Sequence, residues 1–436
     1  MRKPLVPLPN EAGWSHEPLA EVCTLISRGR APSYVSSSPI KAIGQRCITA
    51  TDFDPSVARP HSQRAMSGAL VAKADDVLLN STGTGTIGRS SVFPGMEGFV
   101  VDGHVTVLRP RRETTEGRWL NAVLRTPWGQ TFLETECYSG STNQVELSRT
   151  RLANAMVPLP PLPEQRQIAE VLDTVDEAVR RTEQIIAKLK QVKHGLLHDL
   201  LTQGIDDNGE LRDPDRHPEQ FKDSPLGRIP KGWEVLPLGE LSNVVRGSTP
   251  RPAKDPRYFG GTHTPWITVG ELSRDDWPYL TSTATRLTEL GARFSRHLHA
   301  GTVVLSNSGY GCGVPKILQL SGCANDGIAA FLDLSDGVVP LFLYYFLFSQ
   351  ILNLRTRVAR GVDQPNLNTD LLRAFRIPMP PRAEQEAVSN VLFGIAERER
   401  REETEASKLR LLKSGLMEDL LTGRVRVTPL LEEAAE

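Results

Sequence analysis

The sequence predicts an α+β protein in which two copies of a mixed α/β domain are separated by two long helices. These helices would pair as an antiparallel coiled coil around a pseudo-twofold axis. Residues 158–202 and 378–422 align without a gap at an offset of 220 residues. Apolar residues recur in both segments at steps of three and four, as in a coiled-coil seam. Each segment follows a longer stretch in which strand-like runs alternate with Gly, Ser and Asn turns.

The composition limits the class of protein. Its 436 residues allow two to four domains, and 51 Lys and Arg against 52 Asp and Glu leave no global basic excess. A local basic patch is still compatible with this balance. The five cysteines are scattered, which indicates buried thiols rather than disulfides or a zinc site. The N-terminus lacks the apolar core of a signal peptide, and the most apolar run, 338–352, is shorter than a membrane span. We expect a cytoplasmic protein with a buried amphipathic helix near Pro340.

Each aligned segment begins with prolines, which end the preceding chain and are tolerated only in the first helical turn. We expect spacer helices within 158–204 and 378–423, each roughly 55–60 Å long at about 1.5 Å per residue. The apolar seam residues expected to pair are Ile168, Leu172, Val175, Val179, Ile186, Leu189, Leu196 and Leu200 in the first helix, and Val388, Leu392, Ile395, Leu409, Leu416 and Leu420 in the second. The second seam is polar in its middle, at Glu399 and Glu402, which would set the register of pairing.

The segments ahead of the helices also correspond. GWSHEPLAEV at 13–22 parallels GWEVLPLGEL at 232–241, LNSTGTGTIG at 79–88 parallels LSNSGYGCGV at 305–314, and GSTNQVEL at 140–147 parallels GVDQPNLN at 361–368. This correspondence places the first domain at 1–157, a linker at 205–231, the second domain at 232–377 and a tail at 424–436. Charged and turn-forming residues in the linker favour a connection that runs over the surface.

Gly83, Gly85 and Gly88 have the G-x-G-x-x-G spacing of a dinucleotide-binding loop. Such a loop needs a helix directly after it, because the helix N-terminus binds the phosphate. Strand-forming residues and then Pro94-Gly95 follow instead, and the second copy loses the spacing. We therefore expect tight turns between strands that expose small polar side chains.

Other patterns typical of catalysis or metal binding are weak or missing. His194 and His198 are four apart on a helix, but the second copy has no histidine at either matching position, so a solvated face explains them better. His297 and His299 lack acidic neighbours. The sequence contains no G-x-S-x-G, H-E-x-x-H or P-loop motif, and no Asn/Asp-Pro-Pro-aromatic tetrapeptide of amino-methyltransferases. We expect no catalytic residue, no metal site and no cofactor in this chain.

Two equivalent domains on paired helices could present two modules to one face of a DNA duplex, whose backbone has local twofold symmetry. Several runs also match a known family: EQRQIAEVLDTVDEAV after PLPPL, its second copy, FKDSPLGRIPKGWEV at 221–235, and GSTNQ before PLPPLPEQ. With these runs the sequence resembles the specificity subunit of type I restriction-modification systems, over about residues 13–423.

The resemblance implies two target recognition domains, each reading half of a bipartite, asymmetric sequence in double-stranded DNA. It also implies that the paired helices fix the gap between the half-sites and dock two modification subunits. Those subunits use S-adenosylmethionine to methylate adenine, and restriction subunits use ATP and magnesium. The chain itself would confer specificity without an active site. Two other functions stay open: a scaffold that binds only proteins, and a specificity subunit serving another defence system.

Polar side chains on the domain loops are the candidates for DNA contact: Arg28, Arg30, Asn80, Ser81, Thr82, Thr84, Arg89, Gln144, Arg246, Arg251, Asn307, Ser308, Tyr310, Gln364 and Asn366. Arginines can bind phosphate or guanine, and small polar residues can read base edges. An ordinary solvated surface explains the arginines equally well. The matched positions of Gln144 and Gln364 favour a structural hydrogen bond, and Trp14 and Trp233 are interpreted as core anchors.

Overall fold

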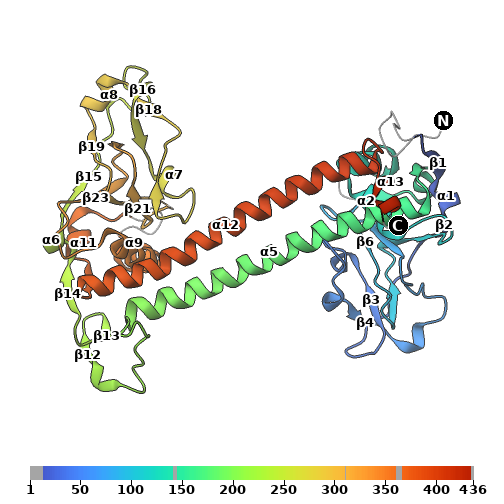
Figure 1. The fold of residues 1–436 in the computed structure, drawn as a ribbon, viewed down its shortest axis with the longest axis horizontal. Helices are drawn as coiled ribbons and strands as arrows, with labels where there is room; N and C mark the ends of the chain where they lie inside the picture. Colours follow the sequence, from blue (N-terminus) through green and yellow to red (C-terminus); the bar gives the residue numbers. More distant parts are fainter. Residues whose placement is uncertain (1–12, 141–144, 310, 360–365, 434–436) are drawn as a thin grey trace. The chain divides into compact units, whose positions relative to one another are not determined.

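The computed structural model describes residues 13–140, 145–309, 311–359 and 366–433. The chain forms two compact units, one of Met1–Thr182 with Glu405–Glu436 and the other of Glu183–Thr404. Both boundaries fall inside long helices, α5 (Leu162–Thr202) and α12 (Arg382–Leu421), so each unit holds one strand-rich domain and part of each helix (Figure 1). The predicted class, two mixed α/β domains with two long helices, is confirmed.

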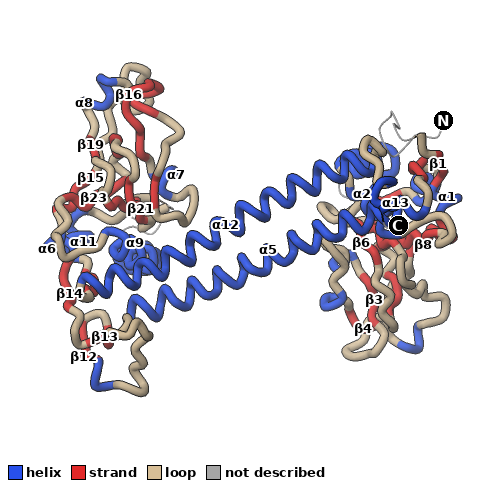
Figure 2. The backbone as a smooth tube through the Cα atoms, in the orientation of Figure 1, coloured by secondary structure: helices blue, strands red, loops and turns tan. Residues whose placement is uncertain are grey.

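The first unit is built on a four-stranded sheet of order β2-β8-β5-β6 and a three-stranded sheet of order β4-β3-β7. Figure 2 draws the strands in red and labels β6 and β8 of the larger sheet and β3 and β4 of the smaller one. Pairing in these sheets is antiparallel except between β3 and β7. The elements are β1 (Ser15–Pro18), α1 (Leu19–Val22), β2 (Cys23–Arg28), β3 (Lys41–Ile43), β4 (Arg59–Pro60), β5 (Val77–Asn80), β6 (Ser90–Val92), β7 (Phe99–Val101), β8 (Val105–Pro110), α2 (Gly117–Arg125), α3 (Pro127–Phe132), β9 (Tyr138–Ser139), β10 (Glu146–Leu147), α4 (Arg149–Ala153), β11 (Met156–Leu159) and α13 (Thr428–Glu433).

The second unit repeats this plan with a five-stranded sheet of order β15-β23-β20-β21-β17 and a four-stranded sheet of order β18-β16-β22-β19. The pairs β16–β22 and β17–β21 are parallel. The elements are β12 (Phe221–Ser224), β13 (Gly227–Pro230), β14 (Glu234–Pro237), α6 (Leu238–Leu241), β15 (Asn243–Arg246), β16 (Phe259–Ile267), α7 (Val269–Leu272), β17 (Tyr279–Leu280), β18 (Arg286–Leu287), α8 (Glu289–Arg293), β19 (Arg296–Leu298), β20 (Val303–Ser306), β21 (Pro315–Leu318), β22 (Gly322–Ala324), β23 (Ile328–Leu332), α9 (Pro340–Ser349), α10 (Ile351–Asn353), α11 (Thr369–Ala374) and β24 (Arg376–Met379).

A buried glutamine in the first turn of each long helix fastens that helix to its domain. Gln165 Oε1 accepts a hydrogen bond from the backbone N–H of Glu116 at 2.9 Å, and Gln385 Oε1 accepts one from Val339 at 2.9 Å. Each glutamine amide also donates to two backbone carbonyls of the same unit. Both side chains are fully buried. The glutamine of the repeated Glu-Gln pair is therefore a structural connector.

The glutamate beside each glutamine binds a tryptophan. Trp14 Nε1 donates to Glu164 at 3.2 Å, and Trp233 Nε1 donates to Glu384 at 3.1 Å. The tryptophans are 7% and 0% exposed, respectively, so their interpretation as core anchors is confirmed. Buried indole N–H groups need an acceptor, which explains why both copies start their domains with Gly-Trp and their helices with Glu-Gln.

Each of these glutamates is also paired with an arginine that follows the other long helix. Arg212, beyond the end of α5, donates to Glu384 at 2.5 Å, and Arg426, beyond the end of α12, donates to Glu164 at 2.6 Å. Within each unit, the start of one long helix therefore meets the end of the other. The two helices run antiparallel there, as predicted.

The predicted seam is the least exposed stripe of both helices. Ile168, Leu172 and Leu420 belong to the core of the first unit, and Leu200, Val388 and Leu392 belong to the core of the second. The other predicted apolar seam positions are buried or partly buried: Val175, Val179, Ile186, Leu189, Leu196, Ile395, Leu409 and Leu416. The predicted packing of α5 against α12 is confirmed.

The polar middle of α12 faces lysines of α5. Lys193 Nζ lies 2.5 Å from Glu399 Oε2, and Lys190 Nζ lies 2.9 Å from Glu403 Oε1. The side chains of Lys193 and Glu399 are only 18% and 10% exposed. The interruption of the apolar seam is thus a paired polar layer between the helices.

We expect Glu399→Ala to lower the free energy of unfolding by about 2 kcal/mol, because it leaves the largely buried Lys193 side chain without its partner. The double variant Lys193→Met with Glu399→Leu should recover wild-type stability, since an apolar pair of similar volume removes both charges. Chemical denaturation followed by circular dichroism measures both. A double variant as unstable as Glu399→Ala would mean that packing, rather than the unpaired charge, causes the loss.

The apolar run near Pro340 forms α9, which begins at the expected residue but is not amphipathic. Six successive residues, Phe342–Leu347, are buried, so no face is left for solvent. The reason is that α9 packs against β20 and β21 and also belongs to a core cluster that includes residues of α12. All five cysteines are buried thiols. Among the described helices, none has the length and apolarity needed to cross a membrane.

Candidate nucleic-acid interface

The glycine-rich turn of each copy is the tip of a β-hairpin. Gly83, Gly85 and Gly88 join β5 to β6 with φ of 99°, 78° and 84°. Gly309 and Gly313 join β20 to β21 with φ of 74° and 90°. A strand follows each turn, where a dinucleotide-binding loop would need a helix. The predicted strand-to-strand turns are confirmed, and their positive φ values explain the glycines.

A segment just ahead of the last short helix of each domain, α4 or α11, lies against this turn. Thr82 forms an isolated antiparallel bridge with Glu146, and Ser308 forms the equivalent bridge with Asn366. Segments that are about sixty residues apart in the chain are therefore side by side in each domain. In the second domain this bridge brings together two residues that were predicted separately, Ser308 and Asn366.

Three nominated residues are buried and cannot contact DNA in this conformation. Asn80 and Ser81 are 0% exposed and Asn307 is 1% exposed, because they continue strands whose residues face the interior. Asn80 Nδ2 donates to the carbonyl of Gln45 at 3.2 Å, and Ser81 Oγ lies 2.5 Å from Thr106 Oγ1. They shape the turn from inside, so we remove them from the candidate set.

Other residues of the first turn are accessible. Thr84 and Arg89 are exposed. Thr82 is partly exposed, and its hydroxyl lies 2.9 Å from Nδ1 of His104. Together with Tyr138, the threonines and His104 line an open hollow of about 780 Å³. Burial raises the pKa of the Tyr138 phenol to about 12, so this hollow offers a neutral hydroxyl at physiological pH.

The nominated arginines of the first domain differ in their surroundings. Arg28 makes an ion pair with Glu146 at 3.0 Å and donates to the carbonyl of Leu147 at 3.1 Å. It therefore ties β2 to β10, which is a structural role. Arg30 is exposed.

The two arginines of the second domain that we predicted to contact DNA, Arg246 and Arg251, both bind Asp326. Arg251 Nη2 lies 3.0 Å from Asp326 Oδ2, and Arg246 Nε donates to the backbone carbonyl of Asp326. Arg296 Nε donates to the carbonyl of Arg246 at 2.7 Å. All three arginines are exposed. We call Arg246, Arg251, Arg296 and Asp326 the arginine patch.

The sequence analysis matched the arginine loops of the two domains but missed an Asp-Gly dipeptide that lies beside the Arg-Gly strand end in each. Arg-Gly ends β2 and β15, and Asp-Gly follows β7 and β22, at Asp102 and Asp326. A Cβ on Gly29 would lie 1.9 Å from a backbone oxygen of β7, and one on Gly247 would lie 2.0 Å from the oxygen of Asn325. The repeat comparison that aligned the longer motifs could have found the Asp-Gly dipeptide as well.

Three candidates remain untested by the geometry. Gln144, Tyr310 and Gln364 lie outside the described residues. The remaining nominated residue of the second turn, Ser308, is partly exposed.

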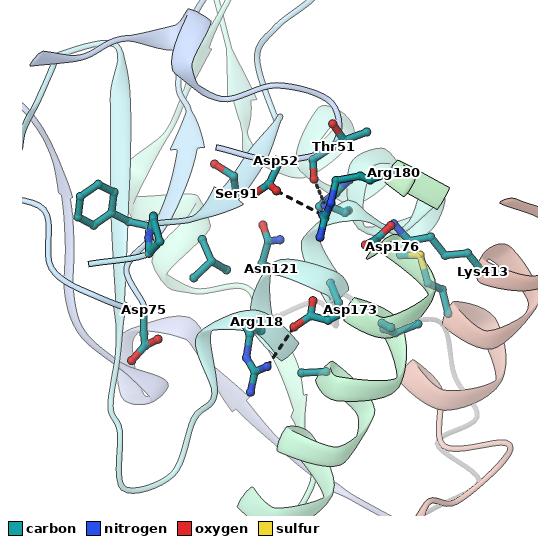
Figure 3. Close-up of a pocket in the computed structure, with 18 residues that line it drawn as sticks. Thr51, Asp52, Asp75, Ser91, Arg118, Asn121, Asp173, Asp176, Arg180 and Lys413 are labelled. Atoms are coloured by element: carbon teal, nitrogen blue, oxygen red, sulfur yellow. Dashed lines mark hydrogen bonds and ion pairs between the residues drawn. The ribbon is translucent and has the colours of Figure 1, made fainter. Parts of the chain in front are cut away.

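A second polar hollow, of about 350 Å³, lies at the junction of the first domain with α5 and α12 (Figure 3). Arg118 pairs with Asp173 at 3.0 Å and Arg180 pairs with Asp52 at 3.3 Å. Burial raises the pKa of the Asp173 carboxyl, and the Arg118 guanidinium opposes that shift. Acidic and basic side chains line this hollow together, which makes it a domain–helix junction rather than a surface for phosphate.

The histidine pairs do not form a metal site with their neighbours. The rings of His297 and His299 are 5.1 Å apart. Within the described ranges, no group of three or more His, Cys, Asp or Glu side chains is arranged to hold a metal ion.

Comparison with known proteins gives one consistent result. Residues 12–191 and 230–405 match the model of the "Type I restriction modification DNA specificity domain". The type I restriction enzyme MjaVIII specificity subunit of Methanocaldococcus jannaschii is 24% identical over 83% of this chain and 81% of that protein. The putative MjaX specificity subunit of the same organism is 25% identical over 78% of this chain and 76% of that protein.

Two solved structures share the fold. One is a type I restriction-modification S subunit from M. genitalium, with a TM-score of 0.62 and 14% identity, covering 96% of this chain and 98% of that one. The other comes from a study of complex assembly and conformational transition in a type I system, with a TM-score of 0.55 and 21% identity, covering 96% of this chain and 100% of that one.

Proposed function

Because the chain belongs to the family of type I restriction-modification DNA specificity proteins, we propose that it selects the DNA target for a methylating complex. Each domain reads one half of a bipartite, asymmetric target in double-stranded DNA. The paired helices α5 and α12 fix the gap between the halves. The chain itself performs no covalent step.

The observation that carries this proposal is the repetition of one surface arrangement on two divergent domains. In each, a glycine-rich hairpin tip meets the segment ahead of the last short helix of the domain, α4 or α11, next to an Arg-Gly and an Asp-Gly dipeptide. Polar side chains on such loops can read base edges, and arginines can bind phosphate or guanine. Because the accessible residues differ between the domains, the two half-sites differ as well.

The partners follow from the same proposal. Two modification subunits dock on the paired helices and bring S-adenosylmethionine for adenine methylation. Restriction subunits join the complex with ATP and magnesium. A chain with this role needs only to hold its domains and present their loops, which agrees with the structural use of the Glu-Gln pairs at the helix starts.

The test is coexpression of this chain with a candidate modification subunit from the same genome, in a host free of adenine methylation. Single-molecule sequencing then maps modified adenines in the host DNA. We expect one bipartite motif with a constant gap. Copurification of the two proteins without any modified adenine would contradict the methylation role and favour a protein scaffold.

Exchanging residues 232–377 for the second domain of another family member should change only one half of that motif. The other half and the gap should stay the same, because the first domain and the helices are untouched. The matched control exchanges the first domain and should change the other half. A change in both halves after either exchange would contradict the assignment of one half-site to each domain.

A further inference from the structure

The arginine patch carries an inference that rests on the proposed function and deepens it. We infer that Arg251 reads a guanine in the half-site of the second domain and that Asp326 is the positioning residue that holds it. Neither the family match nor the similarity to solved structures assigns a role to either residue.

The contacts of Asp326 form a rigid support for Arg251. Asp326 Oδ2 accepts from Arg251 Nη2 at 3.0 Å, while Oδ1 accepts from Thr249 Oγ1 at 2.7 Å. The same hydroxyl accepts from the backbone N–H of Asp326 at 3.1 Å. The carboxylate is therefore fixed by its own loop and by the strand end opposite. An arginine held this way loses less conformational entropy on binding than a free surface side chain does.

The exposure of the pair fits contact with an outside ligand. The Arg251 side chain is 70% exposed, and that of Asp326 is 41% exposed. A guanidinium has five N–H donors, so the contact at Nη2 leaves donors for a second acceptor. Guanine presents O6 and N7 in the major groove at the spacing that an arginine fork matches. The nearby Arg246 and Arg296 add positive charge, which favours a polyanion over a neutral partner.

In the first domain the equivalent aspartate, Asp102, accepts a hydrogen bond from a different kind of side chain. Asp102 Oδ2 accepts from Tyr34 Oη at 3.1 Å, and the Arg59 guanidinium lies 3.6 Å from the centre of the Tyr34 ring. The Asp-Gly dipeptide thus supports the loop after the equivalent strand in both copies, and the supported side chain differs. A common support with a different side chain on each copy is the arrangement expected where two domains read different bases.

The experiment uses the complex with the modification subunit and a plasmid library in which the second half-site is randomised. Arg251→Ala should reduce discrimination at one guanine of that half by about 10- to 100-fold and leave the other positions unchanged. Asp326→Asn should weaken the same position partially. The double variant should be no worse than Arg251→Ala, because Asp326 acts only through Arg251.

Arg257→Ala is the matched control, since Arg257 is a 65% exposed arginine of the same domain whose partner is its own neighbour Asp255. It should leave the motif unchanged, and thermal unfolding should show that each variant is folded. A uniform loss of methylation across all sequences in Arg251→Ala would indicate a phosphate contact and overturn the inference. An unchanged motif would do the same. If the wild-type complex methylates nothing, the proposed function fails, and this inference fails with it.

Discussion

Replacing Glu384 by glutamine should lower the free energy of unfolding of the second unit by about 3–5 kcal/mol, the cost of breaking a largely buried ion pair. The side chains of Glu384 and Arg212 are only 9% and 17% exposed. All three partners of the carboxylate are donors: Arg212, the Trp233 indole and the backbone N–H of Ile205. A glutamine amide has one acceptor oxygen, so it cannot serve all three.

Denaturation by guanidinium, followed by tryptophan fluorescence, measures this loss, because Trp233 lies at the altered site. Glu386→Gln is the control, since Glu386 lies two residues further along the same helix and pairs with Arg382 at an exposed position. It should change stability by no more than about 0.5 kcal/mol. Equal effects of the two variants would show that the Glu384 cluster contributes no more than a surface pair.

The helical part of the fold could be predicted because its signal is local and repeated. Steps of three and four specify the seam along α5 and α12, with apolar residues except for the polar middle of α12, and prolines mark where each helix begins. The buried layer of Lys193 and Glu399 was also visible as a polar interruption. The structure was needed only to show which residue of α5 pairs with Glu399, because the register of antiparallel helices depends on both helices at once.

The candidate interface could be predicted less completely. The repeat led us to predict these loops as the interface, but Asn80 and Ser81 within them point inward, and the strand pairing that decides this is not a local property. Asp326 was missed because its partners Arg251 and Thr249 lie 75 and 77 residues away in the chain. Only the folded sheet brings the end of β15 beside the turn after β22.

Gly247→Ala should destabilise the second unit by about 3 kcal/mol, the upper part of the usual range for forcing an extra methyl into a packed site. The new Cβ would lie 2.0 Å from the oxygen of Asn325 and 2.6 Å from that of Ala324, and both are backbone atoms that cannot rotate away. The strand end must shift, which would also move Asp326 from Arg251. Gly270→Ala is the control, because its Cβ would meet no atom closer than 3.8 Å, and alanine in a helix costs nothing. The denaturation midpoint measures the stability of both variants. A Gly247→Ala protein as stable as the wild type would contradict the prediction, because it would mean that the strand end at Gly247 can move away from the turn at Asp326 without a loss of stability.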